Sequence, residues 1–526
     1  MVLSLAGILI FALGATVYAQ APKLEFRTSG MIDVQTFYGS NVPQYQSGLG
    51  LTSSNTLYQV LNPDYSLGGG LYGKGSKGFN RTKSSWESRA ILKFDAVMGP
   101  NLSGTIMFEI DTFRGGSTWS PFIGNGREAN AFGGWSTDRA SVEVKNIYID
   151  FGLPYFGIPA PTTVRVGAQP IGVRPHILVY TDGFGVTAST KIDPVQFNFY
   201  YAKPLENLDF AADDADVWGG LLSAKLGTIT VGGYGLWYNM NTYPFAVTSP
   251  TGIAGYPAAL NPVVAGTNEA TMYWFGAYMD GKLGPVNLNF DFVYDIGRVE
   301  QKLRSTLVKY PSVEYQGWAT RLKLDFPWEK FNFGAVGMYA TGNDAQQTNP
   351  SGLPGTTTYK GTLSHRAKGY VVPPASEQGP GNQESVVVYS VEPGATGGYG
   401  IANMASYTQM SRGGFGGTWF AKLYGSAKLT PWYKLTLQGL YIGDTTSNGD
   451  TFGNSVKPNG WLKDHGDIGW EIDLINEIWL YQNLRFYIGF GYLFSGGAMD
   501  IRQGSTLSNV SPNNPWALRT RIQYTF

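Results

Sequence analysis

Apolar and polar residues alternate with a period of two in segments spread along almost the whole chain. In residues 286–295, VNLNFDFVYD, apolar side chains occupy every even position, and Asn or Asp occupies nearly every odd one. Residues 484–494 and 516–526 show the same alternation. A period of two places successive side chains on opposite faces of a β-strand. Each segment therefore predicts a strand with one apolar face and one polar face.

Segments of this kind predict eighteen strands, and sixteen is the alternative count. The other predicted strands span 23–38, 86–98, 102–112, 140–151, 162–169, 183–191, 195–203, 216–226, 228–240, 269–283, 312–326, 329–340, 416–430, 434–444 and 467–480. The connections between them alternate between short and long. Short connections lie near 99–101, 192–194, 284–285, 327–329, 431–433 and 481–483. Long connections span roughly 39–85, 113–139, 170–182, 204–215, 241–268, 298–311, 341–415, 445–466 and 495–514.

Tight turns at one end and long loops at the other are typical of a membrane barrel rather than a β-sandwich. The predicted fold is therefore all-β: a transmembrane antiparallel up-and-down β-barrel with short periplasmic turns and long extracellular loops. Aromatic residues near both strand ends fit the girdles that form at membrane interfaces. They are Tyr155, Phe156, Trp328, Trp432, Tyr433, Tyr481, Tyr524 and Phe526 at the short-turn end, and Trp86, Trp237, Tyr238, Trp419 and Trp516 at the other.

The N-terminus has the pattern of an export signal. Residues 2–17 are almost wholly apolar, and Val17-Tyr18-Ala19 offers the small residues of a cleavage site. The apolar run is too short for a stable transmembrane anchor, and no stretch of eighteen apolar residues follows it. The sequence thus predicts a signal peptide over 1–19 and a single barrel domain over 20–526.

Composition excludes several classes of function. The 38 basic and 38 acidic residues cancel, so bulk positive charge does not predict a nucleic-acid partner. The chain has no cysteine, which excludes disulfides, thiol catalysis and cysteine metal sites. Charged residues make up 14 %, about half of the usual share. Long solvent-exposed helices are therefore not expected.

The strand motifs resemble those of Gram-negative outer-membrane porins. The last residues, 521–526 (RIQYTF), look like the C-terminal assembly signal of that class. Residues 144–151, 164–170, 469–474 and 492–496 are similar to strands of porin and alginate-export-type barrels. The resemblance implies a location in the bacterial outer membrane, contact with its lipid, and a possible homotrimer.

Charged residues on the polar strand faces are expected to line the pore. The basic ones are Arg27, Arg89, Lys93, Arg165, Arg321, Lys323, Lys422, Lys428, Arg485, Arg519 and Arg521. The acidic ones are Glu25, Asp33, Glu87, Asp95, Glu109, Asp111, Asp291, Asp295, Asp325, Glu471 and Asp473. Opposing rows of charge would orient polar solutes at a constriction. The alternative is that these residues only hydrate the barrel interior or pair with one another.

Four arginines are predicted to form a basic ladder where the last strand pairs with the first. They are Arg27, Arg485, Arg519 and Arg521, with Arg89 and Lys93 on the next strand. This ladder would favour anions only if no acidic residues lie opposite at the same height.

Two loops are candidates for narrowing the pore. Porin resemblance implies a constriction loop at 171–182, with Arg174, His176 and Asp182. The longest loop, 341–415, contains the apolar run 386–389 and could instead cap or plug the lumen.

Motifs for catalysis, cofactors and metals are incomplete. Residues 68–75 nearly spell a phosphate-binding loop, but Gly75 replaces the required Ser or Thr. The acidic run 213–216 lacks the pattern of a calcium loop. The three histidines, His176, His365 and His465, fall in predicted loops without evident catalytic partners. We therefore predict no catalytic residue, metal or cofactor.

The predicted function is a porin that forms a water-filled channel for passive diffusion of small hydrophilic solutes and ions. Two alternatives remain open. One is a substrate-selective channel or exporter for an anionic saccharide, which the alginate-export resemblance and the basic ladder favour. The other is a structural or adhesive surface barrel. An enzyme is not predicted, because no Ser, His and acid constellation is recognisable.

Overall fold

The structure is a computed structural model of the chain. It describes residues 23–40, 82–114, 142–153, 161–206, 212–243, 245, 268–302, 312–348, 362–376, 384–390, 401, 410–502 and 507–526. The predicted signal peptide over 1–19 and the glycine-rich run 68–75 lie outside these residues.

One large sheet contains nineteen strands, of which eighteen form the barrel and one, β16, is a two-residue addition. The first nine barrel strands are β1 (Leu24–Ser40), β2 (Thr82–Met98), β3 (Leu102–Arg114), β4 (Glu143–Gly152), β5 (Thr162–Val173), β6 (Val179–Ile192), β7 (Val195–Leu205), β8 (Ala215–Leu226) and β9 (Ile229–Tyr243). The other nine are β10 (Asn268–Leu283), β11 (Val286–Gln301), β12 (Ser312–Trp328), β13 (Phe331–Ala340), β17 (Thr418–Thr430), β18 (Tyr433–Asp444), β19 (Asp467–Tyr481), β20 (Leu484–Ser495) and β23 (Trp516–Thr525).

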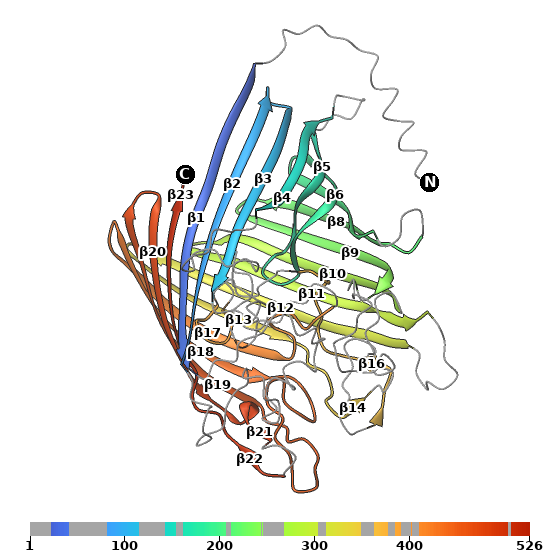
Figure 1. The fold of residues 1–526 in the computed structure, drawn as a ribbon, viewed down its shortest axis with the longest axis vertical. Helices are drawn as coiled ribbons and strands as arrows, with labels where there is room; N and C mark the ends of the chain where they lie inside the picture. Colours follow the sequence, from blue (N-terminus) through green and yellow to red (C-terminus); the bar gives the residue numbers. More distant parts are fainter. Residues whose placement is uncertain are drawn as a thin grey trace, which may run out of the picture.

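Each barrel strand pairs antiparallel with its neighbours in chain order, and β23 pairs with β1 to close the sheet (Figure 1). The closed antiparallel barrel of eighteen strands confirms the predicted fold, and the alternative of sixteen strands is wrong. The shear of the closed sheet tilts the strands and offsets the ends of neighbouring strands.

Short elements lie in the long loops. They are β14 (Gln347–Thr348), β15 (Thr362–Leu363), β16 (Arg366–Ala367), β21 (Ile501–Arg502), β22 (Asn509–Val510) and the 3₁₀ turn η3 (Gly497–Met499). β16 runs parallel to β12, along the part of β12 that extends beyond its pairing with β13. No helix in the described part of the chain is long and apolar enough to cross a membrane.

The seam between β1 and β23 is closed by backbone and side-chain contacts. The Gly30 amide donates to the Phe526 carbonyl at 2.8 Å, and the Phe526 amide donates to the Gly30 carbonyl at 3.0 Å. A Cβ atom at Gly30 would lie 2.6 Å from the Phe526 ring. Thr36 and Thr520 share a hydrogen bond of 2.7 Å across the same seam. The terminal phenylalanine thus completes the ladder, and glycine makes room for its ring.

The outer surface of the barrel is apolar, as the alternation predicts. Large apolar side chains that are at least a third exposed occur on strands all round the barrel, among them Phe26, Ile106, Ile149, Leu222, Phe292, Leu322, Leu423, Ile472 and Ile522. Charged neighbours in the sequence, such as Asp291 and Glu471, are fully buried inside. A closed sheet with an apolar exterior satisfies its backbone internally and can span a bilayer.

Most of the predicted aromatic girdle lies on the outer face, with one correction. Trp328, Trp432, Tyr481 and Trp86 are more than half exposed. Tyr238 instead points inward, because it directly follows the exposed Trp237 in β9 and successive strand residues face opposite sides of the sheet. Its ring packs edge-on against Trp274, with ring centroids 5.1 Å apart. Tyr155 and Phe156 lie outside the described residues.

The hydrophobic core lies inside the barrel. Inward-facing apolar residues of the wall pack against residues of loop 341–415 that enter the lumen. The wall residues include Trp274, Val293, Tyr315, Val336, Phe420 and Leu440, and the loop residues include Tyr370, Val371, Val386, Val387, Val388 and Tyr389. Part of the interior is therefore filled by the chain itself and is not lined only by polar groups.

Candidate functional site: the filled lumen

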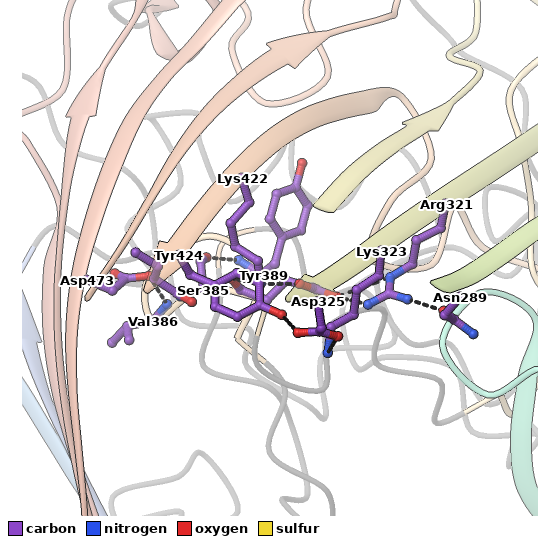
Figure 2. Close-up of polar contacts among 12 residues, drawn as sticks. Asn289, Arg321, Lys323, Asp325, Ser385, Val386, Tyr389, Lys422, Tyr424 and Asp473 are labelled. Carbon is purple, nitrogen blue, oxygen red and sulfur yellow. Dashed lines mark hydrogen bonds and ion pairs between the residues drawn. The ribbon is translucent and has the colours of Figure 1, made fainter. Parts of the chain in front are cut away.

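A segment of the longest loop, residues 384–390, lies inside the barrel, and we call it the plug segment. Its Glu384 carboxylate sits between Arg321 of β12 and Lys422 of β17. Figure 2 labels these two basic residues. Arg321 Nη2 lies 2.5 Å from Glu384 Oε1, and Lys422 Nζ forms an ion pair with Glu384 Oε2. All three side chains are 7 % exposed or less. Two cationic side chains of the barrel wall, Arg321 and Lys422, thus bind one carboxylate of the plug segment, Glu384.

The wall also offers carboxylates, and the plug segment meets them with backbone N–H groups. The Val387 and Val388 amides donate to the two carboxylate oxygens of Glu471, at 2.5 and 3.0 Å. The Val386 amide donates to Asp473 at 3.2 Å. Glu471 and Asp473 both project inward from β19 and are fully buried. The plug segment therefore supplies hydrogen-bond or ion-pair partners to wall groups of both signs, which offsets part of the cost of burying them.

Neighbouring amide side chains hold these groups in place. Asn289 accepts a hydrogen bond of 2.7 Å from Arg321 (Figure 2). Gln438 donates to Asp473 at 2.8 Å and to the Glu384 carbonyl at 3.1 Å. We call the set of Arg321, Lys422, Glu471 and Asp473 with Glu384 the clamp. It joins three separate wall strands, β12, β17 and β19, to one loop segment.

A second part of the same loop, 370–376, is fixed in the lumen in the same way. The Val371 amide donates to Asp295 Oδ1 at 3.2 Å, while the Gly317 amide donates to the other oxygen at 3.1 Å. The indole N–H of Trp274 donates to the Val371 carbonyl at 2.8 Å. The predicted pore-lining Asp295 therefore binds the loop and does not face water.

The turn between β5 and β6 also enters the lumen, as the predicted constriction loop would. Arg174 reaches across to Asp280 at 2.6 Å and forms an ion pair with Asp291, with its guanidinium 4.2 Å from the Tyr278 ring centroid. Its φ of 45° is in the left-handed region, which is unusual for a residue other than glycine. The Tyr370 hydroxyl donates to the Ile177 carbonyl at 2.5 Å, so this turn and the long loop contact each other inside the barrel.

The constriction turn is shorter than the sequence predicts. β5 continues to Val173 and β6 begins at Val179, so that only five residues, 174–178, connect them. His176 lies in this turn, where burial and the charge of Arg321 lower its pKa. Asp182 lies on β6 instead, where it accepts a hydrogen bond of 2.8 Å from Asn146.

Four of the basic residues in or beside the predicted ladder have acidic partners. Arg521 pairs with Asp33 at 2.5 Å, Arg89 with Glu109 at 3.3 Å, Lys93 with Asp95 at 3.0 Å, and Arg485 with Glu477 at 3.4 Å. Arg519 lies over the Phe37 ring, 5.5 Å from its centroid. The condition for an anion-preferring ladder is therefore not met along this wall.

Arg27 does not join the ladder, and this part of the prediction is wrong. β23 pairs with β1 only from Met31 onward, because the stagger of the closed sheet lets β1 extend past the C-terminus. Arg27 lies beyond that point, opposite Asp95 of β2, and pairs with Glu25 at 3.0 Å on an exposed part of the strand.

A cavity of about 300 Å³ lies at the short-turn end of the barrel. It is bounded by the Gly99–Asn101 turn and by inward residues of both charges: Arg27, Lys93, Arg165, Asp95 and Asp150. Arg165 pairs with Asp150 at 2.7 Å. This cavity is polar and lined by charges of both signs, three basic and two acidic, as the lumen of a channel for small polar solutes would be.

The remaining residues that were predicted to line the pore are either on the inner face of the barrel or have side chains that the structure does not describe. Lys323 lies 3.4 Å from Asp325, which also accepts a hydrogen bond from Tyr424 (Figure 2). Lys428 is on the same face of β17 as Lys422. The backbones of Glu87 and Asp111 belong to β2 and β3, but their side chains lie outside the description.

The histidines His365 and His465 and the acidic run 213–216 contact other side chains of the protein. His365 lies 3.7 Å from Glu314, and His465 Nδ1 lies 2.9 Å from Asp450. In the acidic run, Asp214 pairs with Lys203 at 2.8 Å, and Asp216 accepts a hydrogen bond from the Tyr201 hydroxyl. Within the described ranges, no group of three or more His, Asp or Glu is placed to hold a metal ion.

Sequence reasoning missed four residues that complete the lumen site: Glu384, Asn289, Gln438 and Lys145. Lys145 pairs with Glu109 at 2.8 Å and with Asp182 at 3.3 Å. Glu384 directly precedes the apolar run 386–389, which did indicate a plug. Its pairing with two wall cations depends on a contact across 38 to 63 residues, and no local pattern specifies that.

The clamp is expected to lose strength only in strong acid. Burial raises the pKa of Glu384, but the charges of Lys422 and Arg321 outweigh burial and lower it to about 2. Because this pKa is below the ordinary value of 4.5, Glu384 is fully charged above pH 4.5, and its ion pairs with Arg321 and Lys422 weaken as the pH falls toward 2. Conductance across a planar bilayer should therefore stay level from pH 8 to pH 5 and rise below pH 4.

The matched variant for this titration is Glu384→Gln, which removes the titrating carboxyl group. Its conductance should be higher than that of the wild type at pH 7 and should show a smaller rise in acid. A rise centred between pH 5 and pH 7 in the wild type would assign the opening to another group.

No family model and no curated protein matches the chain. Among solved structures, the chain is similar to the outer membrane protein opdK of Pseudomonas aeruginosa, with a TM-score of 0.46, 8 % identity, and 95 % of this chain and 98 % of that chain covered. It is also similar to OccK11 (OpdR) of the same organism, with a TM-score of 0.45, 9 % identity, and 95 % and 96 % covered. For OccK5 (OpdH), also from that organism, the TM-score is 0.44 at 10 % identity, with 95 % and 98 % covered. These are distant similarities, so the function proposed below rests on the chain's own residues.

Proposed function

We propose that this protein is an outer-membrane porin through which small hydrophilic solutes and ions diffuse, with passage controlled by the plug segment and the 174–178 turn. The observation that carries this proposal is the clamp, in which a charged inner wall holds a loop by ion pairs and hydrogen bonds. Barrels of sixteen to eighteen strands are wide enough to enclose an aqueous channel. A barrel of this width with a removable plug is suited to transport.

The proposed location follows from the surface of the barrel and from the start of the sequence. The apolar exterior requires a bilayer, and bacterial single-chain barrels of this type are outer-membrane proteins. The predicted signal peptide over 1–19 supports export to that membrane. In this placement the short turns face the periplasm and the long loops face the exterior.

The proposed channel discriminates weakly between anions and cations. Most of the wall bases are paired with acids, and the cavity at the short-turn end is lined by both charges. This pairing argues against the exporter of an anionic saccharide that the alginate-export resemblance implied. The homotrimer implied by porin resemblance stays a prediction, which the mass of the detergent-solubilised protein tests.

Solute uptake by proteoliposomes tests the proposed function. Vesicles containing the purified protein should swell faster with a pentose than with a trisaccharide, and at similar rates with neutral and uronic-acid sugars of equal size. The control is the same protein unfolded by heating before reconstitution. Faster uptake of the uronic acid would support the saccharide exporter. No uptake by either the wild type or a variant with a broken clamp would favour a structural barrel.

A further inference from the structure

A row of polar residues crosses the outer face of the barrel at the long-loop end. The strand register places Thr271 of β10 opposite Arg298 of β11, Arg298 opposite Glu314 of β12, and Glu314 opposite Arg366 of β16. Residues in register on neighbouring strands share one face of the sheet. β16 therefore extends this row by one strand, using a residue pair from the long loop.

The row next to it, toward the membrane, is mostly apolar. Two residues further along the strands, Tyr273, Ile296 and Gln316 lie in register. The next row in the same direction contains Phe275 and Trp318. Tyr273 stacks on Trp237 and on Phe275, with ring centroids 6.4 and 6.2 Å apart. Aromatic side chains of this kind mark the boundary between lipid and water.

A cavity of about 480 Å³ spans these two rows on the outside of the barrel. Its apolar side is formed by Tyr273 and Ile296, and its polar side by Arg298, Arg366 and Lys368. Its volume is in the range of small-molecule sites. The cavity thus has one wall suited to hydrocarbon and one suited to an anion, at the level where a lipid changes from acyl chain to headgroup.

The charges of the cavity leave a positive excess. Arg298 is 62 % exposed and pairs with Glu300 at 3.0 Å. Arg366 is 64 % exposed and lies 3.8 Å from Glu314, a distance too long for a close hydrogen bond. No acidic side chain among the described residues pairs with Lys368. Among the residues that line the cavity, these three cations therefore face a single acid, Glu314, while Glu300 and Glu269 lie opposite each other further along the strands. Both Arg366 and Lys368 can turn toward a ligand.

We propose that this cavity binds a phosphorylated lipid of the outer leaflet, with its phosphate on Arg298, Arg366 and Lys368 and its apolar part on Tyr273 and Ile296. Guanidinium groups suit phosphate because they donate two parallel hydrogen bonds. A soluble anion would make no contact with the apolar wall of the cavity, which faces the bilayer. The inference rests on the membrane placement proposed above, but it does not require that the channel conducts.

Native mass spectrometry of the detergent-solubilised protein tests the site, with lipid A as the phosphorylated probe and phosphatidylcholine as the zwitterionic one. The wild type should retain lipid A through detergent exchange and lose phosphatidylcholine. Each basic residue near a membrane surface contributes roughly 1 kcal/mol to binding of an anionic lipid, so the double variant Arg366→Gln, Lys368→Gln should bind lipid A roughly thirtyfold more weakly.

The matched control is Lys191→Gln, Lys225→Gln, which removes two exposed lysines beside the periplasmic turns and should leave retention unchanged. Lys368→Arg should preserve it, which separates charge from general stability. The proposed lipid site is wrong if the Arg366→Gln, Lys368→Gln variant retains lipid A like the wild type. It is also wrong if this variant and the Lys191→Gln, Lys225→Gln control lose lipid A equally. Displacement of lipid A by millimolar inorganic phosphate would mean that the apolar wall contributes nothing, and would overturn the lipid assignment.

The test of the lipid site and the test of the proposed channel give independent results. A protein that retains lipid A but passes no solute in proteoliposomes would contradict the channel and leave the lipid site standing. A protein that conducts but retains no lipid A would contradict the lipid site alone.

Discussion

Replacing Glu384 with methionine is expected to release the plug segment and raise single-channel conductance severalfold. The substitution leaves Arg321 and Lys422 buried without their shared anion. Removing one partner of a buried ion pair costs about 3–5 kcal/mol. Since 1.4 kcal/mol corresponds to a tenfold change in an equilibrium, the ratio of clamped to released segments should fall by roughly a hundredfold or more.

The control replaces all three members of the triad, Arg321, Glu384 and Lys422, with methionine. Buried ionic triads can often be replaced by apolar residues of similar volume without loss of stability, because no charge then remains uncompensated. The triple variant should therefore recover low conductance in the same planar-bilayer measurement. If the single variant conducts like the wild type, or if the triple variant stays as open as the single one, the clamp does not hold the plug segment.

Replacing Leu423 with arginine is expected to block insertion of the barrel into lipid. Leu423 is 71 % exposed on the outer face of β17, near the middle of that strand. An arginine facing lipid at the bilayer midplane destabilises a barrel by about 2–4 kcal/mol. The folded fraction in lipid vesicles, measured by the heat-dependent shift on a gel, should fall strongly.

The matched variant is Thr436→Arg on the neighbouring strand β18, which alternates with the exposed Leu437 and so faces the lumen. An added lumen charge should alter ion selectivity and leave the folded fraction near that of the wild type. Equal folding of the two arginine variants would contradict the membrane placement of the outer face.

The barrel strands could be predicted from sequence because their alternation is local. In β11, residues 286–295 fix which side chains point outward before any partner strand is known, and Phe292 and Asp291 lie on the expected faces. Alternation fails to identify the inner face where the lumen itself is apolar. This is why the predicted outer girdle includes Tyr238, although Tyr238 is buried on the inner face, where it packs against Trp274.

The lumen site depends on contacts that no local pattern encodes. The predicted ladder failed at Arg27, because the stagger between β1 and β23 decides which residues share a height. The apolar run 386–389 did point to a plug, but the role of Glu384 emerges only when β12 and β17 bring Arg321 and Lys422 together. Register and loop placement are properties of the closed barrel, so the sequence pattern alone leaves them open.

The most direct test of the central claim is single-channel recording of the wild type in a planar bilayer, with the reversal potential measured in a KCl gradient. The structure predicts discrete steps of low conductance and a reversal potential close to zero, because the plug segment narrows the lumen and most of the wall bases are paired with acids. Absence of conductance from both the wild type and the Glu384→Met variant would contradict the claim that this barrel is a channel.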